Sequence, residues 1–190
     1  MKLIIASNNK HKIREIKEIL SEKFEEILSL REAGIDHETV EDGTTFLENA
    51  YKKAREIAEI SGEASLADDS GICIDALNGA PGIFSARFAG VHGDDNANNS
   101  LVLEKLSGKE NRNAHYTCAM SLVYPDGKHI FAEGYMYGEI TESPRGSGGF
   151  GYDPLFVITG QSRTVAEMTD EEKNAVSHRR RALDALLEKL

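Results

Sequence analysis

Two adjacent aspartates, Asp68 and Asp69, stand between two short apolar runs and are followed by Ser70 and Gly71. Neighbouring carboxylates repel each other, and a hard cation such as Mg²⁺ offsets that repulsion well. Because neighbouring side chains of a strand point to opposite faces, one aspartate is expected to face a site while the other serves the scaffold. On local grounds alone, an ordinary Asp-Ser-Gly turn explains the same residues equally well.

A basic helix start follows a polar loop near the N-terminus, in the order Ser7-Asn8-Asn9-Lys10-His11-Lys12. The first turn of a helix normally prefers Asp or Glu, because its free N–H groups carry a partial positive charge. A basic first turn is therefore either a solvent-exposed Lys/Arg face, whose charges are mildly unfavourable at this end of a helix, or an anion site. In the second case the N–H groups, the Ser and Asn side chains and Lys12 would receive phosphate oxygens.

A glycine-rich segment, Gly146 to Asp153, matches the letters of a dinucleotide-binding fingerprint. The context does not fit, because a strand rather than a helix follows it. A mobile loop whose backbone approaches a ligand is the better interpretation. Phe150 and Tyr152 could then stack on a base, and Asp153 could accept a hydrogen bond from it.

Two further charged groups have both an ordinary and a functional interpretation. Glu41 and Asp42 precede a predicted helix, where acidic residues are common, and Glu41 gains interest only as a second oxygen ligand beside Asp69. Lys173 and the run Ser177 to Arg181 form either a basic helix end or a donor cluster for phosphate or base oxygens.

The composition limits the class of protein: 190 residues, 40% hydrophobic and 28% charged, with a net charge of −10. A strongly acidic chain is a poor candidate for binding a nucleic acid polymer, which depends on neutralising phosphates. No apolar run reaches the roughly 18 residues of a membrane span, and the N-terminal apolar stretch is too short for a signal peptide. We therefore expect a cytoplasmic protein without a membrane partner, in which Cys73 and Cys118 are free thiols.

Strands and helices are expected to be interleaved along the chain. Thr45 and Glu48 form a capping box for one helix, and Gly62 suits its end. A long hairpin is expected to turn at residues 125–128. This order predicts an α/β fold with a mixed sheet. The expected strands span 2–6, 26–30, 64–67, 72–77, 114–124, 129–140 and 155–158, and the expected helices span 10–21, 46–61, 95–106, a short segment after Thr169, and the C-terminus after His178.

Taken together, these segments resemble the Ham1-like family of nucleoside triphosphate pyrophosphatases, also called inosine triphosphatases. Each segment alone is weak, but six of them in order at compatible spacings are specific and cover the whole chain. One departure is Ser7, where the family often has Thr, and both residues offer a hydroxyl. The matching segments are Ser7 to Lys12, Glu41 to Ala50 with Lys53-Ala54, Ala67 to Gly71, Gly79 to Arg87, Gly148 to Pro154, and Lys173 with Ser177 to Arg179.

The resemblance implies a single domain over residues 1–190 that hydrolyses inosine, deoxyinosine and xanthosine triphosphates (ITP, dITP and XTP). The products are the monophosphate and pyrophosphate, so deaminated purines leave the nucleotide pool. It further implies an elongated mixed β-sheet flanked by helices, two lobes with the active-site cleft between them, a Mg²⁺ requirement and a homodimer.

The family pattern also assigns roles to particular residues. Asp69 is the expected general base and, with Glu41, the expected Mg²⁺ ligand, which leaves Asp68 as a supporting residue. The expected substrate-binding residues are Ser7, Asn8, Asn9, Lys10, His11, Lys12, Lys53, Ser70, Phe150, Gly151, Tyr152, Asp153, Lys173, His178 and Arg179.

Two rival functions stay open. One is a phosphatase that releases orthophosphate from nucleotides or sugar phosphates. The other is a nucleotide sensor that binds ITP with Mg²⁺ without turnover, and the intact acidic residues Glu41, Asp68 and Asp69 speak against it.

Overall fold

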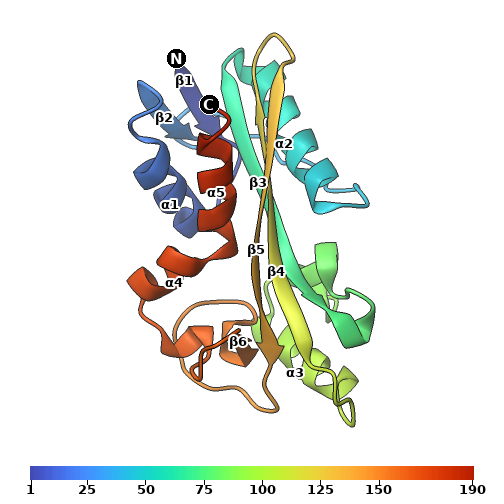
Figure 1. The fold of residues 1–190 in the computed structure, drawn as a ribbon. Helices are drawn as coiled ribbons and strands as arrows, with labels where there is room; N and C mark the ends of the chain where they lie inside the picture. Colours follow the sequence, from blue (N-terminus) through green and yellow to red (C-terminus); the bar gives the residue numbers. More distant parts are fainter. The chain divides into compact units, whose positions relative to one another are not determined.

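The computed structural model describes the backbone of residues 1–190 and every side chain except that of His11, which lies outside the described residues. Figure 1 shows strands and helices interleaved along the chain, as the sequence predicts. The strands are β1 (Lys2–Ile5), β2 (Glu26–Ser29), β3 (Ala64–Ile74), β4 (Asn113–Val123), β5 (His129–Ile140) and β6 (Phe156–Ile158), and the helices are α1 (Lys10–Leu20), α2 (Phe46–Ser61), α3 (Asp95–Lys105), α4 (Asp170–Val176) and α5 (His178–Leu187).

The strands form one six-stranded sheet in the order β2-β1-β3-β4-β5-β6. Strand β1 pairs in parallel with both β2 and β3, whereas β5 pairs with β6 in the antiparallel sense. The sheet is therefore mixed, and the predicted α/β class is confirmed. The predicted hairpin is confirmed as well, because β4 and β5 are neighbours joined by a tight turn in which the Tyr124 N–H donates to the Lys128 carbonyl at 2.8 Å.

Strand β3 differs from the prediction in a way that concerns the acidic pair. Two short strands on either side of an Asp-Ser-Gly segment were expected, but a single strand runs from Ala64 to Ile74 through both aspartates. The turn interpretation of this segment is wrong. Residues 64–69 are all buried, so the two carboxylates lie in the interior of a strand rather than at an exposed bend.

The chain divides into two compact units, and the division crosses β3 between Asp69 and Ser70. Unit 1 contains residues 1–69, 118–134 and 182–190, and unit 2 contains residues 70–117 and 135–181. Each unit has its own hydrophobic core. The core of unit 2 is formed by residues from β3, α3, β4 and β6, among them Ile72, Val102, Tyr116 and Phe156.

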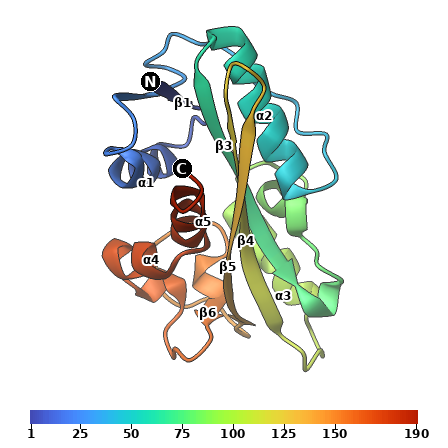
Figure 2. The same cartoon turned by 45° about the horizontal axis from the view of Figure 1, so that its top comes forward.

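In unit 1 the helices cover both faces of the sheet. Successive side chains of β3 point to opposite faces and so pack against different helices. Leu66 packs in one cluster with residues of α1 and of α5, which Figures 1 and 2 show on the same side of the strands. The next residue, Ala67, packs in a second cluster with Ala54 and Ile57 of α2. Two residues further along each face are Asp68 and Asp69, which are therefore presented to different helices.

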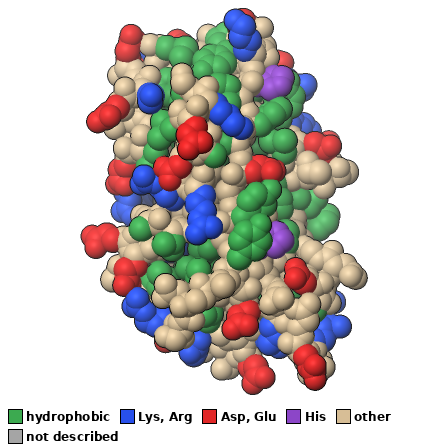
Figure 3. Space-filling model, viewed as in Figure 1, with side chains coloured by type: hydrophobic (Ala, Val, Ile, Leu, Met, Phe, Trp, Pro, Cys, Tyr) green, Lys and Arg blue, Asp and Glu red, His purple; other side chains and the backbone are tan. Residues whose placement is uncertain are grey.

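No described helix is long and apolar enough to cross a membrane. On the face drawn in Figure 3, basic and acidic side chains are interspersed.

The start and end of α2 match the prediction. Thr45 accepts a hydrogen bond from the Glu48 N–H while Glu48 accepts from the Thr45 N–H, and Gly62 ends the helix in the left-handed conformation at φ 69°. Asn49, Ala50, Ala54, Ile57 and Ala58 form its buried face. The cap fixes where α2 begins, and thereby the positions of its buried side chains.

Replacing Thr45 by Ala is expected to lower the free energy of unfolding by about 1 kcal/mol, because the cap hydrogen bond to Glu48 is lost. Chemical denaturation of Thr45→Ala and Thr45→Ser measures this effect. Thr45→Ser keeps a hydroxyl and should stay within about 0.5 kcal/mol of the wild type, since Ser caps at least as well as Thr. Equal stability of all three proteins would contradict the assignment of this cap.

Candidate active site

Asp68 forms a buried ion pair with α1. Its Oδ2 lies 2.8 Å from Lys12 Nζ, and only 1% of the Asp68 side chain and 17% of the Lys12 side chain are exposed. The thiol of Cys118 lies 3.8 Å from the same oxygen. Removing one partner of such a pair leaves an uncompensated buried charge, at a cost of about 3–5 kcal/mol. Asp68 therefore acts as the counter-ion of Lys12.

Asp69 faces α2 instead. Its Oδ2 accepts a hydrogen bond from Asn49 Nδ2 at 3.1 Å, and its Oδ1 lies 4.0 Å from Lys53 Nζ. Burial raises the pKa of the Asp69 carboxyl above its ordinary value, and the positive charge of Lys53 offsets only part of that effect. A buried carboxylate whose charged form is disfavoured is a good candidate for proton transfer or for a metal.

Lys53 joins Asp69 to Glu41. Its Nζ lies 2.5 Å from Glu41 Oε1. Burial acts to lower the pKa of Lys53, but the negative charges of Asp69 and Glu41 outweigh burial, so this pKa is raised. The ammonium group is held between the two carboxylates that the sequence singled out as metal ligands.

One face of α2 holds the loop that carries Glu41. The side chains concerned are spaced three, four and seven residues apart, so they lie on one side of the helix. The loop runs past them in the opposite direction to the helix. The contacts are Gly43 with Asn49, Asp42 with Lys52, Glu41 with Lys53, and both Thr39 and His37 with Glu56.

These residues pass a simple test of fit for Mg²⁺. The carboxylates of Glu41 and Asp69 both lie beside the Lys53 ammonium group, at 2.5 Å and 4.0 Å from its Nζ. Among the described residues no group of three or more His, Cys, Asp or Glu side chains forms a ready metal cage. Mg²⁺ is usually held by one or two carboxylates together with substrate phosphates and water, so a pair of carboxylates is the set it requires.

The N-terminal loop is organised by its own side chains. Ser7 Oγ accepts from the Asn9 N–H at 3.2 Å, and Asn9 Oδ1 accepts from the Lys12 N–H at 3.3 Å. Asn9 thereby caps the start of α1, while Asn8 and Lys10 are exposed. From this helix start Lys12 reaches Asp68, so the basic first turn of α1 is more than a solvated surface.

In unit 2, Ser70 lies beside the C-terminal basic cluster. Arg179 Nη2 lies 3.4 Å from Ser70 Oγ, and Arg179 and His178 are 5% and 7% exposed. The His178 ring stacks on Tyr116 with the ring centroids 4.9 Å apart. The three substrate-binding residues predicted here are therefore brought together, and two of them are buried cation or imidazole groups.

The glycine-rich loop has a different internal order from the one expected. Phe150 is 45% exposed, whereas Tyr152 is 4% exposed and its hydroxyl donates to the Ser85 carbonyl at 2.7 Å. Asp153 is buried and accepts from the Phe150 N–H at 2.9 Å. It also forms an ion pair with Lys173, whose Nζ lies 4.2 Å from the centroid of the Phe150 ring.

It follows that only one of the two rings expected to stack on a base is open to a ligand. Phe150 presents its ring, while Tyr152 belongs to the core of unit 2. The Asp153 carboxylate holds the loop in place through Phe150 and Lys173. Gly151 is fixed by its N–H, which donates to Asp95 Oδ2 at 2.7 Å.

Sequence reasoning missed Asn49, Tyr116 and Asp95. Asn49 is 2% exposed although asparagine is a poor helix former, so an asparagine on the apolar stripe of α2 was the available signal. Tyr116 and Asp95 are found only through their contacts with His178 and Gly151, residues remote from them in the sequence.

Known proteins resemble this chain along its whole length. The Ham1 family matches residues 3–189. A dITP/XTP pyrophosphatase of Clostridium perfringens is 52% identical, with 100% of this chain and 97% of that protein covered. The Ham1 protein of Staphylococcus aureus is 38% identical, has a TM-score of 0.91, and is aligned over 100% of this chain and 99% of its own.

A further solved structure, a nucleoside-triphosphatase / dITP/XTP pyrophosphatase of Mycobacterium abscessus, is 48% identical with a TM-score of 0.84, covering 98% of this chain and 99% of its own. The six segments singled out in the sequence therefore belong to a match that covers the chain from end to end. This chain belongs to the Ham1 family.

Proposed function

We propose that this protein is a nucleoside triphosphate pyrophosphatase that converts dITP, ITP and XTP to the monophosphate and pyrophosphate. The relatives in Clostridium perfringens and Mycobacterium abscessus carry the name dITP/XTP pyrophosphatase. One structural observation carries the proposal beyond kinship: the carboxylates of Glu41 and Asp69 lie on either side of the Lys53 ammonium group, at 2.5 Å and 4.0 Å from its Nζ. A triphosphate and its metal need that combination of carboxylates and ammonium groups.

Glu41 and Asp69 would hold Mg²⁺ against the triphosphate. When bound there, Mg²⁺ neutralises charge that develops on the phosphate oxygens during cleavage between the α- and β-phosphates. Asp69 takes the proton of the attacking water at Oδ1, since its Oδ2 already accepts the Asn49 amide. The water oxygen bonds to the α-phosphorus as the α–β anhydride bond breaks and pyrophosphate leaves.

The remaining substrate-binding residues divide by chemistry. The phosphate oxygens are bound by two ammonium groups, two hydroxyls and the start of a helix. These groups belong to Lys12 and Lys53, to Ser7 and Ser70, and to Asn9 with the exposed start of α1. Asn8, Lys10 and His11 belong to that loop and helix start, and the side chain of His11 lies outside the described residues. Lys12 is paired with Asp68, so a phosphate competes for a cation that is already oriented.

The base is selected by donors in unit 2. Hypoxanthine and xanthine carry an acceptor oxygen where adenine carries a donor amine. His178 and Arg179 are buried donors, which pair with the oxygen and are left unmatched by the amine. Phe150 stacks on the base, and Lys173 with Asp153 fixes the ring of Phe150.

We further propose that the protein works in the cytoplasm and that it is a homodimer, the assembly that the family resemblance implies.

Hydrolysis of dITP is expected to release pyrophosphate and dIMP in equal amounts, with no orthophosphate. Anion chromatography of a reaction lacking inorganic pyrophosphatase measures both products.

Asp69→Asn is the matched control: it keeps the shape and an acceptor for Asn49 but should lose nearly all turnover. Because burial already disfavours the Asp69 charge, its unfolding midpoint without metal should equal or exceed that of the wild type. Orthophosphate as the first product would favour the rival phosphatase, and binding without turnover would favour the sensor.

The value of kcat/KM for ITP is expected to exceed that for ATP by about a hundredfold or more. Each buried donor left unmatched costs about 1–3 kcal/mol, and two such donors face the adenine amine in this proposal. Steady-state assays with ITP and ATP, under identical metal concentrations, measure the ratio. Comparable values for the two substrates would refute the role of His178 and Arg179 in base selection.

A further inference from the structure

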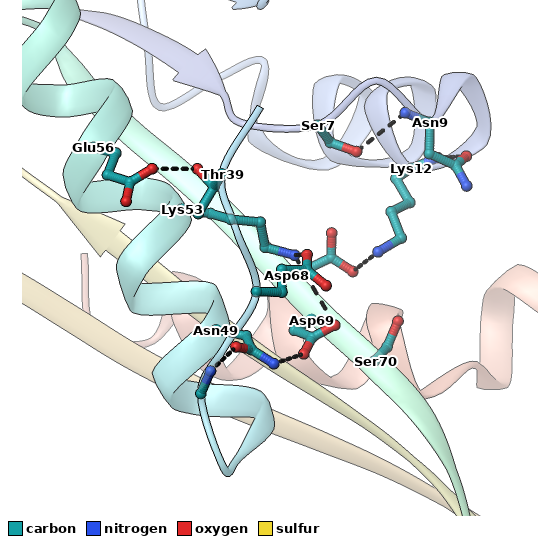
Figure 4. A network of polar contacts seen from close by, with 12 residues as sticks. Ser7, Asn9, Lys12, Thr39, Asn49, Lys53, Glu56, Asp68, Asp69 and Ser70 are labelled. Atoms are coloured by element: carbon teal, nitrogen blue, oxygen red, sulfur yellow. Dashed lines mark hydrogen bonds and ion pairs between the residues drawn. The ribbon is translucent and has the colours of Figure 1, made fainter. Parts of the chain in front are cut away.

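Asn49 contacts two separate segments of unit 1 that carry the proposed metal ligands. Its Oδ1 accepts from the Gly43 N–H at 2.9 Å, and its Nδ2 donates to Asp69 Oδ2 at 3.1 Å (Figure 4). A backbone N–H can only donate and a carboxylate can only accept, so these partners fix the orientation of the amide group. Only 2% of Asn49 is exposed, so water does not substitute for either contact.

We propose that Asn49 is a positioning residue, which holds the Glu41 loop and the Asp69 carboxylate at a fixed separation for metal and water. This inference rests on the proposed function and adds to it a residue that touches neither substrate nor metal. Glu41 is two residues from Gly43, so a bond at Gly43 restricts Glu41 directly. The other end of the same amide restrains Asp69, and the rigid helix α2 keeps the two ends together.

The packing at Gly43 shows how closely the loop approaches α2. A Cβ atom at this position would lie 2.6 Å from Asn49 Oδ1 and 2.9 Å from Glu48 Cβ. Both distances are below normal contact, and the backbone of Gly43 is not in the left-handed region. Glycine is therefore required here for space alone. Because the added Cβ would collide with Asn49 Oδ1, Gly43→Ala is expected to push the loop away from Asn49 while Asn49 itself is not substituted.

A purely structural role is the competing explanation, and unit 2 contains an asparagine that illustrates it. Asn98 is 1% exposed, its Oδ1 accepts from the Ala89 N–H at 2.8 Å, and its Nδ2 donates to the Ala86 carbonyl at 3.4 Å. Both of its partners are backbone groups. Asn98 therefore provides a matched control: it is an equally buried asparagine on a helix that also bonds a loop, but it contacts no carboxylate.

The first test measures the loop without metal or substrate. Hydrogen exchange of the amide of residue 43, followed by NMR, is expected to become about tenfold faster in Asn49→Leu, because one hydrogen bond of ordinary strength is lost. Gly43→Ala should accelerate the same amide to a similar extent. Asn98→Leu should lose comparable global stability and leave this amide unchanged after correction for that loss.

The second test measures how tightly the metal is held during turnover. The Mg²⁺ concentration for half-maximal dITP hydrolysis is expected to rise about ten- to hundred-fold in Asn49→Leu and in Gly43→Ala. The KM for dITP at saturating Mg²⁺ should change less than about threefold, since Asn49 does not contact the base or the sugar. Asn98→Leu should keep the wild-type Mg²⁺ requirement.

The outcomes separate this inference from the function on which it rests. Faster exchange at residue 43 together with a higher Mg²⁺ requirement, in both variants but not in Asn98→Leu, supports the positioning role. An unchanged Mg²⁺ requirement in folded Asn49→Leu, or unchanged exchange at residue 43, overturns it. If the wild-type protein does not hydrolyse dITP, the proposed function fails instead, and the exchange test still decides the Asn49 contact.

Discussion

The repulsion between two adjacent buried carboxylates is the constraint on which the rest of unit 1 depends. Asp68 and Asp69 lie inside β3 and are 2% and 9% exposed. A buried charge without compensation costs several kcal/mol, so each carboxylate requires a partner of its own. The alternation of the strand separates the requirements: α1 supplies Lys12 to Asp68, and α2 supplies Lys53 and Asn49 to Asp69.

The two carboxylates have different partners, and this difference supports the roles that we propose for them. Asp68 forms a close ion pair through its Oδ2 and thereby orients the Lys12 ammonium group. Lys53 Nζ lies 2.5 Å from Glu41 Oε1 but 4.0 Å from Asp69 Oδ1, so its ion pair with Asp69 is the looser of the two. The Asp69 side of the strand is therefore the side at which we propose that a divalent cation binds. The long loop before α2 is attached along one face of that helix, and these contacts place Glu41 beside Lys53.

Much of this arrangement could be predicted from the sequence, because it depends on local patterns. The bounds of α2 followed from Thr45, Glu48 and Gly62, and the split of the acidic pair followed from strand alternation. The features that the sequence did not predict depend on contacts between residues remote in the sequence. The continuity of β3 is decided by pairing with its neighbours in the sheet, which overrides the turn tendency of Asp-Ser-Gly. The burial of Tyr152 and the contacts of Asn49 depend on residues far away in the sequence, and no periodicity reports them.

The central claim is that Glu41 and Asp69, and not Asp68, hold the catalytic metal. Anomalous diffraction from crystals grown with Mn²⁺ and a dITP analogue that carries an α,β-imido link tests it most directly. We expect one Mn²⁺ at about 2.1 Å from carboxylate oxygens of Glu41 and Asp69 and from the analogue's phosphates. Asp68 should bind no metal, whether or not it is still paired with Lys12. Mn²⁺ bound to Asp68, or an analogue bound without any metal at Glu41 and Asp69, would contradict the account.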